Sequence, residues 1–221
     1  MGLAEFPNFD DAMRLRLAAA TDRLADEFQG IYDRQTISAV VNESAQRLSS
    51  HGITPFVHIL AERFARERLR ATAQAEGRLA KERPSIVFVS LTGGGRAQIA
   101  AALFAKRAGD AVLVHSAGSD VSADIDPNVR AALAEVSIDL EEAFTKPLTP
   151  EVLGATDVVV TMGRSVGAVD IPDSVRHVDW RVGDPAGADL EEVRRVREDI
   201  GRRIDALAEE LVPAVHTSTT A

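Results

Sequence analysis

An apolar segment that runs into three consecutive glycines restricts the possible folds of this chain more than any other feature. Residues 86–104 read IVFVSLTGGGRAQIAAALF. The apolar run Ile86–Val89 predicts a buried strand, and Gln98–Ala108 predicts a helix. Strands that are apolar throughout are typical of parallel sheets covered by helices on both faces. This part of the chain is therefore expected to begin an α/β unit.

The alternation of strand and helix continues along the chain. Further strands are predicted at Ala111–His115, Asp157–Thr161 and Val175–Trp180, and further helices at Pro127–Val136 and Leu190–Leu211. The last helix has apolar residues at three- and four-residue steps, which gives it one apolar face. Strands that alternate with helices favour an α/β fold with a parallel sheet flanked by helices.

The first 80 residues have a different pattern, with the periodicity of helices. Apolar residues spaced three, four or seven apart predict one helix from Met13 to Ile31, a second from Ile37 to Leu48, and a third from Val57 onward. We expect a three-helix bundle over residues 1–80. The polar stretch 76–84 is the predicted linker, or the end of the third helix. Residues 84–212 then form the α/β domain, and residues 213–221 form a disordered tail.

Composition argues against several classes of function. The 221-residue chain has no cysteine and five scattered histidines, so disulfides, thiol chemistry and a metal site are not expected. A net charge of −9 argues against nucleic acid as a partner. We find no apolar run long enough to span a membrane and no secretory pattern, so we expect a cytoplasmic protein without membrane contact. No feature indicates a cofactor.

The loop between the first strand and its helix, Ser90–Arg96, is the candidate binding site. The residues inside it are Leu91, Thr92, Gly93, Gly94 and Gly95. Ligands of parallel α/β sheets bind beyond the carboxyl ends of the strands, where this loop begins a helix. Its backbone N–H groups, the helix dipole and the Arg96 guanidinium would together bind an anion. Neither GxGxxG nor GxxxxGK[ST] is present. A strand–helix turn without a ligand is the alternative.

The spacing Ser90-x5-Arg96 resembles the phosphate loop of low-molecular-weight protein tyrosine phosphatases and of arsenate reductases with the same fold, which have Cys-x5-Arg. Later segments resemble the same family: HSAGSD at 115–120, IDPNVRAALAEVSIDL at 125–140, KPLTPEVLGATDVVVTMG at 146–163 and VDWRVGDPAG at 178–187. The resemblance covers roughly residues 84–212 and implies a parallel four-stranded sheet flanked by helices. The earlier segment LAERFARERLRATAQAEG resembles the helical domain that precedes actinobacterial arsenate reductases.

The resemblance also implies roles for individual residues. In the family, a thiolate at the first loop position attacks phosphorus or arsenic, and the aspartate of an Asp-Pro pair protonates the leaving oxygen. These positions correspond to Ser90 and Asp184 here, with Arg96 as the arginine that holds the oxyanion. Residues 91–96 would supply the oxyanion contacts. In the arsenate reductases, further thiols or a small external thiol then reduce the arsenic.

The sequence departs from the family pattern where the chemistry takes place. Ser90 stands at the nucleophile position, and an alcohol is a much weaker acid than a thiol. Gly93 and Ala97 replace a common asparagine and serine, while Arg164 and Ala168 lie where thioredoxin-coupled reductases have redox cysteines. Because the changes extend beyond position 90, we favour a natural loss of chemistry with a retained oxyanion loop. Arg164 is either a second positive charge near the site or a solvated side chain.

Three hypotheses follow from these residues. The first is an oxyanion-binding protein, inactive as written, whose partner is phosphate, arsenate, sulfate or a phosphorylated protein. The second is an active arsenate reductase or phosphatase in which serine has replaced the cysteine. The third is a scaffold that forms a homodimer through the apolar faces of the N-terminal helices.

Overall fold

The computed structural model describes residues 6–50, 56–121, 124–163 and 169–211. The positions of Arg164 and Ala168 and the predicted tail 213–221 lie outside these ranges. Within them, no helix is both long enough and apolar enough to cross a bilayer.

Three helices form the N-terminal part of the chain. They are α1 (Asp11–Glu27), α2 (Arg34–Ser50) and α3 (Val57–Ala75). The first begins after Asp10, whose carboxylate accepts a hydrogen bond from the backbone N of Met13 at 2.8 Å. Their apolar stripes pack against one another in a core that is separate from the core of the α/β part. The predicted N-terminal helical region is confirmed.

This N-terminal core uses most of the apolar surface that suggested self-association. Leu17, Leu24 and Leu48 are fully buried inside it. Among the described residues, the large apolar side chains that remain exposed are Leu15, Phe56 and Ile59. Dimerisation through this part of the chain stays a prediction.

A four-stranded parallel sheet forms the centre of the α/β part. Its strands are β1 (Ser85–Ser90), β2 (Leu113–Gly118), β3 (Val158–Met162) and β4 (Arg176–Trp180), in the order β2-β1-β3-β4. All three pairings are parallel, which confirms the predicted sheet. The predicted strand Ala111–His115 begins too early, because a turn of 3-10 helix occupies Gly109–Ala111.

Helices cover both faces of the sheet. On one face lie α4 (Arg96–Ala108), α5 (Pro127–Ala134) and α7 (Leu190–Leu211). Ile86 and Phe88 of β1 point to that side, whereas Val87 and Val89 point to the other, where they pack with Leu153. Leu153 belongs to α6 (Pro150–Ala155), a helix that the sequence analysis did not predict. Six residues are too few to produce a helical apolar stripe.

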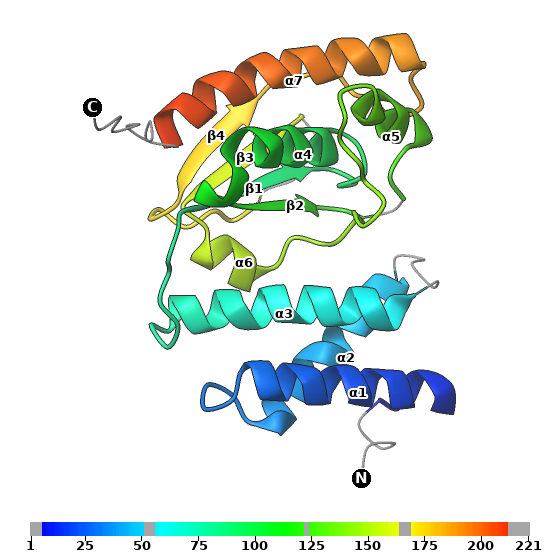
Figure 1. The fold of residues 1–221 in the computed structure, drawn as a ribbon, viewed down its shortest axis with the longest axis vertical. Helices are drawn as coiled ribbons and strands as arrows, with labels where there is room; N and C mark the ends of the chain where they lie inside the picture. Colours follow the sequence, from blue (N-terminus) through cyan, green and yellow to red (C-terminus); the bar gives the residue numbers. More distant parts are fainter. Residues whose placement is uncertain (1–5, 51–55, 122–123, 164–168, 212–221) are drawn as a thin grey trace, which may run out of the picture.

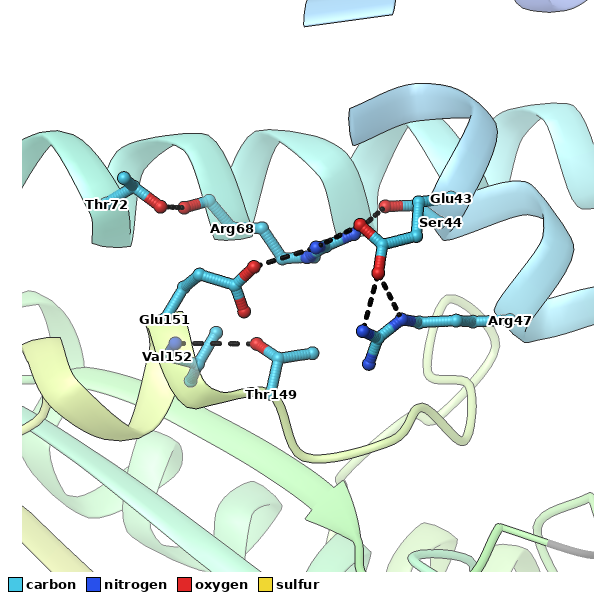
Figure 2. A network of polar contacts seen from close by, with 8 residues as sticks. All are labelled: Glu43, Ser44, Arg47, Arg68, Thr72, Thr149, Glu151 and Val152. Atoms are coloured by element: carbon cyan, nitrogen blue, oxygen red, sulfur yellow. Dashed lines mark hydrogen bonds and ion pairs between the residues drawn. The ribbon is translucent and has the colours of Figure 1, made fainter. Parts of the chain in front are cut away.

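The third helix connects the two parts of the chain. In Figure 1, α3 lies between α1 and the α/β part, beside α6. The guanidinium of Arg68 on α3 binds Glu43 of α2 and Glu151 of α6, each at 2.7 Å, and Ser44 at 3.1 Å (Figure 2). Because the Arg68 side chain is only 3% exposed, these contacts are shielded from solvent. The side chain of one α3 residue therefore joins α2 to α6.

Candidate functional site

The candidate site is built at the carboxyl end of β1. The strand ends at Ser90, which lies opposite Gly118 in the register of β1 and β2. The helix α4 begins at Arg96, two residues before the predicted start, and Gly95 is its N-cap. The loop 90–96 therefore connects the end of a central strand to the positive end of a 13-residue helix, which is a favourable place for an anion.

Backbone hydrogen bonds orient the peptides of this loop. The carbonyl oxygens of Ser90, Leu91 and Gly94 accept hydrogen bonds from the backbone N of Ser119, Asp120 and Asp126, at 3.1, 2.8 and 3.4 Å. In a planar trans peptide the N–H points away from the C=O. The N–H groups of the residues that follow these carbonyls must therefore point away from the 119–126 segment. An anion on that side of the loop would meet these N–H groups.

Two glycines of the loop are needed for its close contacts. Gly93 has a φ of +74°, and a Cβ on it would lie 2.9 Å from the backbone N of Gly118. A Cβ on Gly95 would lie 2.9 Å from Cγ of Pro185. The second contact places the Asp184-Pro185 pair directly against the loop, although it lies far away in the sequence.

The side chain of Ser90 is buried at the base of the loop, since the residue is 2% exposed. Its Oγ accepts a hydrogen bond from the backbone N of Ala97 at 3.4 Å. This N–H belongs to the first turn of α4, so it would stabilise negative charge on the atom at position 90. A thiolate would benefit from that stabilisation, whereas a serine hydroxyl stays neutral.

The other two predicted residues are in direct contact. Nη2 of Arg96 lies 2.9 Å from Oδ2 of Asp184. The arginine side chain is 10% exposed, while that of the aspartate is 58% exposed. Because an oxyanion would bind the same N–H groups of the guanidinium, Asp184 occupies through Oδ2 a contact that an oxyanion would also use. The remaining oxygen, Oδ1, accepts from the backbone N of Ala186 at 3.2 Å.

Arg96 and Asp184 also line a cavity of about 690 Å³. The other residues that line it are Gly163, Asp179, Trp180, Arg181 and Val182. Asp179 and Arg181 were not predicted as site residues. Asp179 belongs to β4 and Arg181 directly follows it, at the carboxyl end of a parallel strand, where ligands commonly bind. Within the described residues, no cluster of histidine and carboxylate side chains could hold a metal ion.

Two residues at the start of α5 hold the Asp-Pro segment in place, and sequence reasoning missed both. Oδ2 of Asp126 accepts from the backbone N of Gly187 at 3.3 Å, and Nδ2 of Asn128 donates to the carbonyl of Ala188 at 2.9 Å. The only sequence signal at Asp126 was that of a helix N-cap. The structure thus brings the loop, Arg96 and Asp184 together and shows which residues support them, while the roles of the predicted site residues stay predictions.

Comparison with known proteins agrees with this geometry. Residues 85–216 match the family model described as low molecular weight phosphotyrosine protein phosphatase. Residues 17–73 match the model described as protein-tyrosine-phosphatase-like, N-terminal domain. An arsenate reductase of Brevibacillus brevis is 33% identical over 131 residues, which is 58% of this chain and 97% of the relative.

Solved structures extend the likeness to most of the chain. The thioredoxin-dependent arsenate reductase of Corynebacterium glutamicum is 36% identical with a TM-score of 0.78, and the match covers 88% of this chain and 96% of that one. A mutant of YwlE arginine phosphatase with a phosphorylated active site serine is 27% identical with a TM-score of 0.52, over 58% of this chain and 98% of that one. With its sheet, its loop and these matches taken together, the chain belongs to the low molecular weight phosphotyrosine protein phosphatase family.

Proposed function

We propose that the loop 90–96 binds a tetrahedral oxyanion, namely phosphate, arsenate or sulfate, and that the chain as written does not turn it over. The observation that supports this most directly is the buried Arg96 at the N-terminus of α4, beside loop peptides whose carbonyls are bonded on the opposite side. A guanidinium and helix N-terminal amides are the groups that proteins use for phosphate. Free oxyanions or a phosphorylated protein in the cytoplasm are the proposed partners.

The electron balance of arsenate reduction supports the absence of turnover. Converting arsenate to arsenite requires two electrons, which arsenate reductases of this family take from thiols. The chain has no cysteine, so it has no thiol of its own to supply these electrons. The Corynebacterium relative is described as thioredoxin-dependent. In this chain, position 90 has an alcohol, which forms no disulfide with an external thiol.

Calorimetric titration of the full-length chain with phosphate, arsenate and sulfate tests this proposal. We expect one site per chain for phosphate and arsenate, and no release of arsenite when a thiol reductant is added. Absence of binding by all three anions would overturn the oxyanion site. Arsenite formation at a rate proportional to protein concentration would overturn the absence of turnover.

Covalent phosphorylation of Ser90 is a second candidate, favoured by the YwlE mutant with a phosphorylated active site serine. In this step Ser90 Oγ forms a bond to phosphorus of an aryl phosphate while the bond from phosphorus to the aryl oxygen breaks. The aryl oxygen leaves with the electron pair of the broken bond as an aryl oxide, and the hydroxyl proton passes to water. We expect intact-protein mass spectrometry after incubation with p-nitrophenyl phosphate to show one added phosphoryl group, and the Ser90→Ala variant to show none. An unmodified parent would exclude this candidate.

The contact between Arg96 and Asp184 predicts a gain from Asp184→Asn. The carboxylate competes with an oxyanion for the guanidinium, and its negative charge repels the oxyanion. The variant should therefore bind phosphate about two- to fivefold more tightly, the range expected for a partly exposed ion pair. Calorimetry at constant ionic strength measures the difference. The matched control is Asp179→Asn, which removes the same charge from the same cavity but contacts Thr161 instead of Arg96. Equal gains in both variants would contradict direct competition.

A further inference from the structure

The segment 146–151 lies between the N-terminal helices and the oxyanion loop. It begins at Lys146, continues through Leu148, and enters α6 at Pro150. The carbonyl of Lys146 accepts from the backbone N of Gly118 at 2.9 Å, and the backbone N of Leu148 donates to the carbonyl of Gly118 at 2.9 Å. Both backbone polar groups of Gly118 are therefore bonded to this segment. The segment therefore helps to hold Gly118, which is also the last residue of β2.

Gly118 in turn lies directly against the oxyanion loop. A Cβ on Gly118 would be 2.8 Å from both the carbonyl carbon and the carbonyl oxygen of Thr92. A Cβ on Gly93 would be 2.9 Å from the backbone N of Gly118. Because the two backbones touch without intervening side chains, a shift of Gly118 must move Thr92 and Gly93, the residues whose peptides would face the anion.

Two consecutive residues of α3 hold the two ends of the 146–151 segment by pairs of opposite polarity. At the first end, the Glu67 carboxylate binds the ammonium of Lys146 through Oε2 and Nδ1 of His115 through Oε1, the latter at 2.7 Å. At the second end, the Arg68 guanidinium binds the carboxylate of Glu151 at 2.7 Å (Figure 2). Both ends of the segment are thus attached to the N-terminal helical part.

The contact at Lys146 is buried and charged. The side chains of Glu67, Lys146 and His115 are between 13% and 14% exposed. Burial raises the pKa of Glu67, but Lys146 and His115 outweigh it and bring that pKa to about 2. The carboxylate is therefore ionised at neutral pH. A shielded ion pair is favourable only when its charged atoms stay at hydrogen-bond distance, and removing one partner leaves the other charge buried and unpaired.

We propose that Glu67 is a positioning residue for the oxyanion loop, acting from the N-terminal helical part through Lys146 and Gly118. This inference rests on the proposed function of the loop. The N-terminal helices would then influence the anion affinity of the loop 90–96, although none of the loop residues belongs to them. Glu67 touches no loop residue in the chain of contacts from α3 to Thr92 and Gly93, so its effect on an anion is indirect.

The test compares Glu67→Gln with Glu62→Gln in the full-length chain. Glu62 lies on the same helix, is similarly buried with 14% of its side chain exposed, and binds Arg23 and Arg66 instead of the 146–151 segment. We expect phosphate affinity to fall on the order of tenfold in Glu67→Gln, as when supporting residues of a binding site are removed, and to stay within about twofold in Glu62→Gln. Calorimetry well below the melting temperature of each variant measures both.

A second measurement separates positioning from general loss of stability. The amide resonances of Gly93 and Gly118 should shift in ¹⁵N–¹H spectra of Glu67→Gln and remain in place in Glu62→Gln, with or without phosphate. If Glu67→Gln does not fold, Glu67→Asp keeps the charge but shortens the side chain, and its affinity should lie measurably below that of the parent.

The outcomes of these experiments distinguish the positioning role of Glu67 from the oxyanion site itself. Unchanged affinity and unchanged loop amides in the Glu67 variants would overturn the positioning role and leave the oxyanion site intact. Equal losses in the Glu67 and Glu62 variants would also overturn it. If the parent itself binds no phosphate, the proposed function fails, and the amide shifts alone decide whether Glu67 positions the loop.

Discussion

Replacing Ser90 with cysteine is expected to produce hydrolysis of p-nitrophenyl phosphate at a rate on the order of a thousandfold above that of the parent chain. Loss of a nucleophile from an intact catalytic site costs about 10⁶ in kcat, and a smaller gain is expected here because Ala97 and Gly93 also depart from the family pattern. The cysteine Sγ would stand where Ser90 Oγ now accepts from the backbone N of Ala97. That N–H and the positive end of α4 would lower the pKa of a thiol, which makes it an effective nucleophile near neutral pH.

Two control variants test whether the gained activity depends on the side chain at position 90 and on Arg96. Ser90→Ala should be inactive, and Ser90→Cys combined with Arg96→Ala should lose most of the gained activity, because the arginine stabilises charge on the transferred phosphoryl group. The release of p-nitrophenol is measured twice, once with the protein in excess over the substrate and once with the substrate in excess over the protein. An inactive Ser90→Cys variant that still binds phosphate would show that the nucleophile is not the only catalytic element lost.

Replacing Arg96 with alanine is expected to weaken phosphate binding by about tenfold to a hundredfold, since hydrogen bonds to charged groups contribute about 1.5–3 kcal/mol. The side chain is 90% shielded at the start of α4, so its charge acts on the anion with little screening by solvent. Calorimetric titration of the variant with phosphate measures the loss. Arg96→Lys should recover only part of it, because an ammonium lacks the planar pair of donors.

Arg181→Ala is the matched control for Arg96. It removes one positive charge from the lining of the same cavity, but Arg181 lies at the end of β4 and not in the loop. A loss of affinity less than about threefold is expected from the general field alone. Equal losses in the two variants would mean that phosphate binds through the overall charge of the cavity, which would contradict a specific site in the loop 90–96.

Much of the α/β part follows from local sequence pattern. The apolar runs at 86–89 and 158–160 predicted central strands, and every residue of β1 and β3 is indeed buried. The last helix was predicted with its observed bounds because its apolar residues recur over many turns. Errors were confined to short elements and to ends, such as the start of β2 and the unpredicted α6, where few residues share a pattern.

The sequence by itself also determined the place and type of the candidate site. Three glycines between a strand and a helix favour a tight loop whose backbone N–H groups lie near the helix N-terminus, and the spacing from Ser90 to Arg96 places the arginine there as well. The absence of cysteine determined equally that no residue of this chain supplies a thiolate or electrons. These conclusions depend on neighbouring residues and on composition, which the sequence displays directly.

Only the tertiary structure decided which distant groups meet at this loop. The ion pair of Arg96 with Asp184, and the contacts from Glu67 to Lys146 and from Lys146 to Gly118, join residues that lie dozens of positions apart. A charged residue on a helix has the same local preference whether it faces solvent or an oppositely charged partner, so Glu67 and Glu62 look alike in the sequence. Their different partners arise from the packing of α3, which places Glu67 beside Lys146 and His115 of the α/β part and Glu62 beside Arg23 and Arg66 of the N-terminal helices. Residues five positions apart on a helix face different neighbours, and only the tertiary structure decides what those neighbours are.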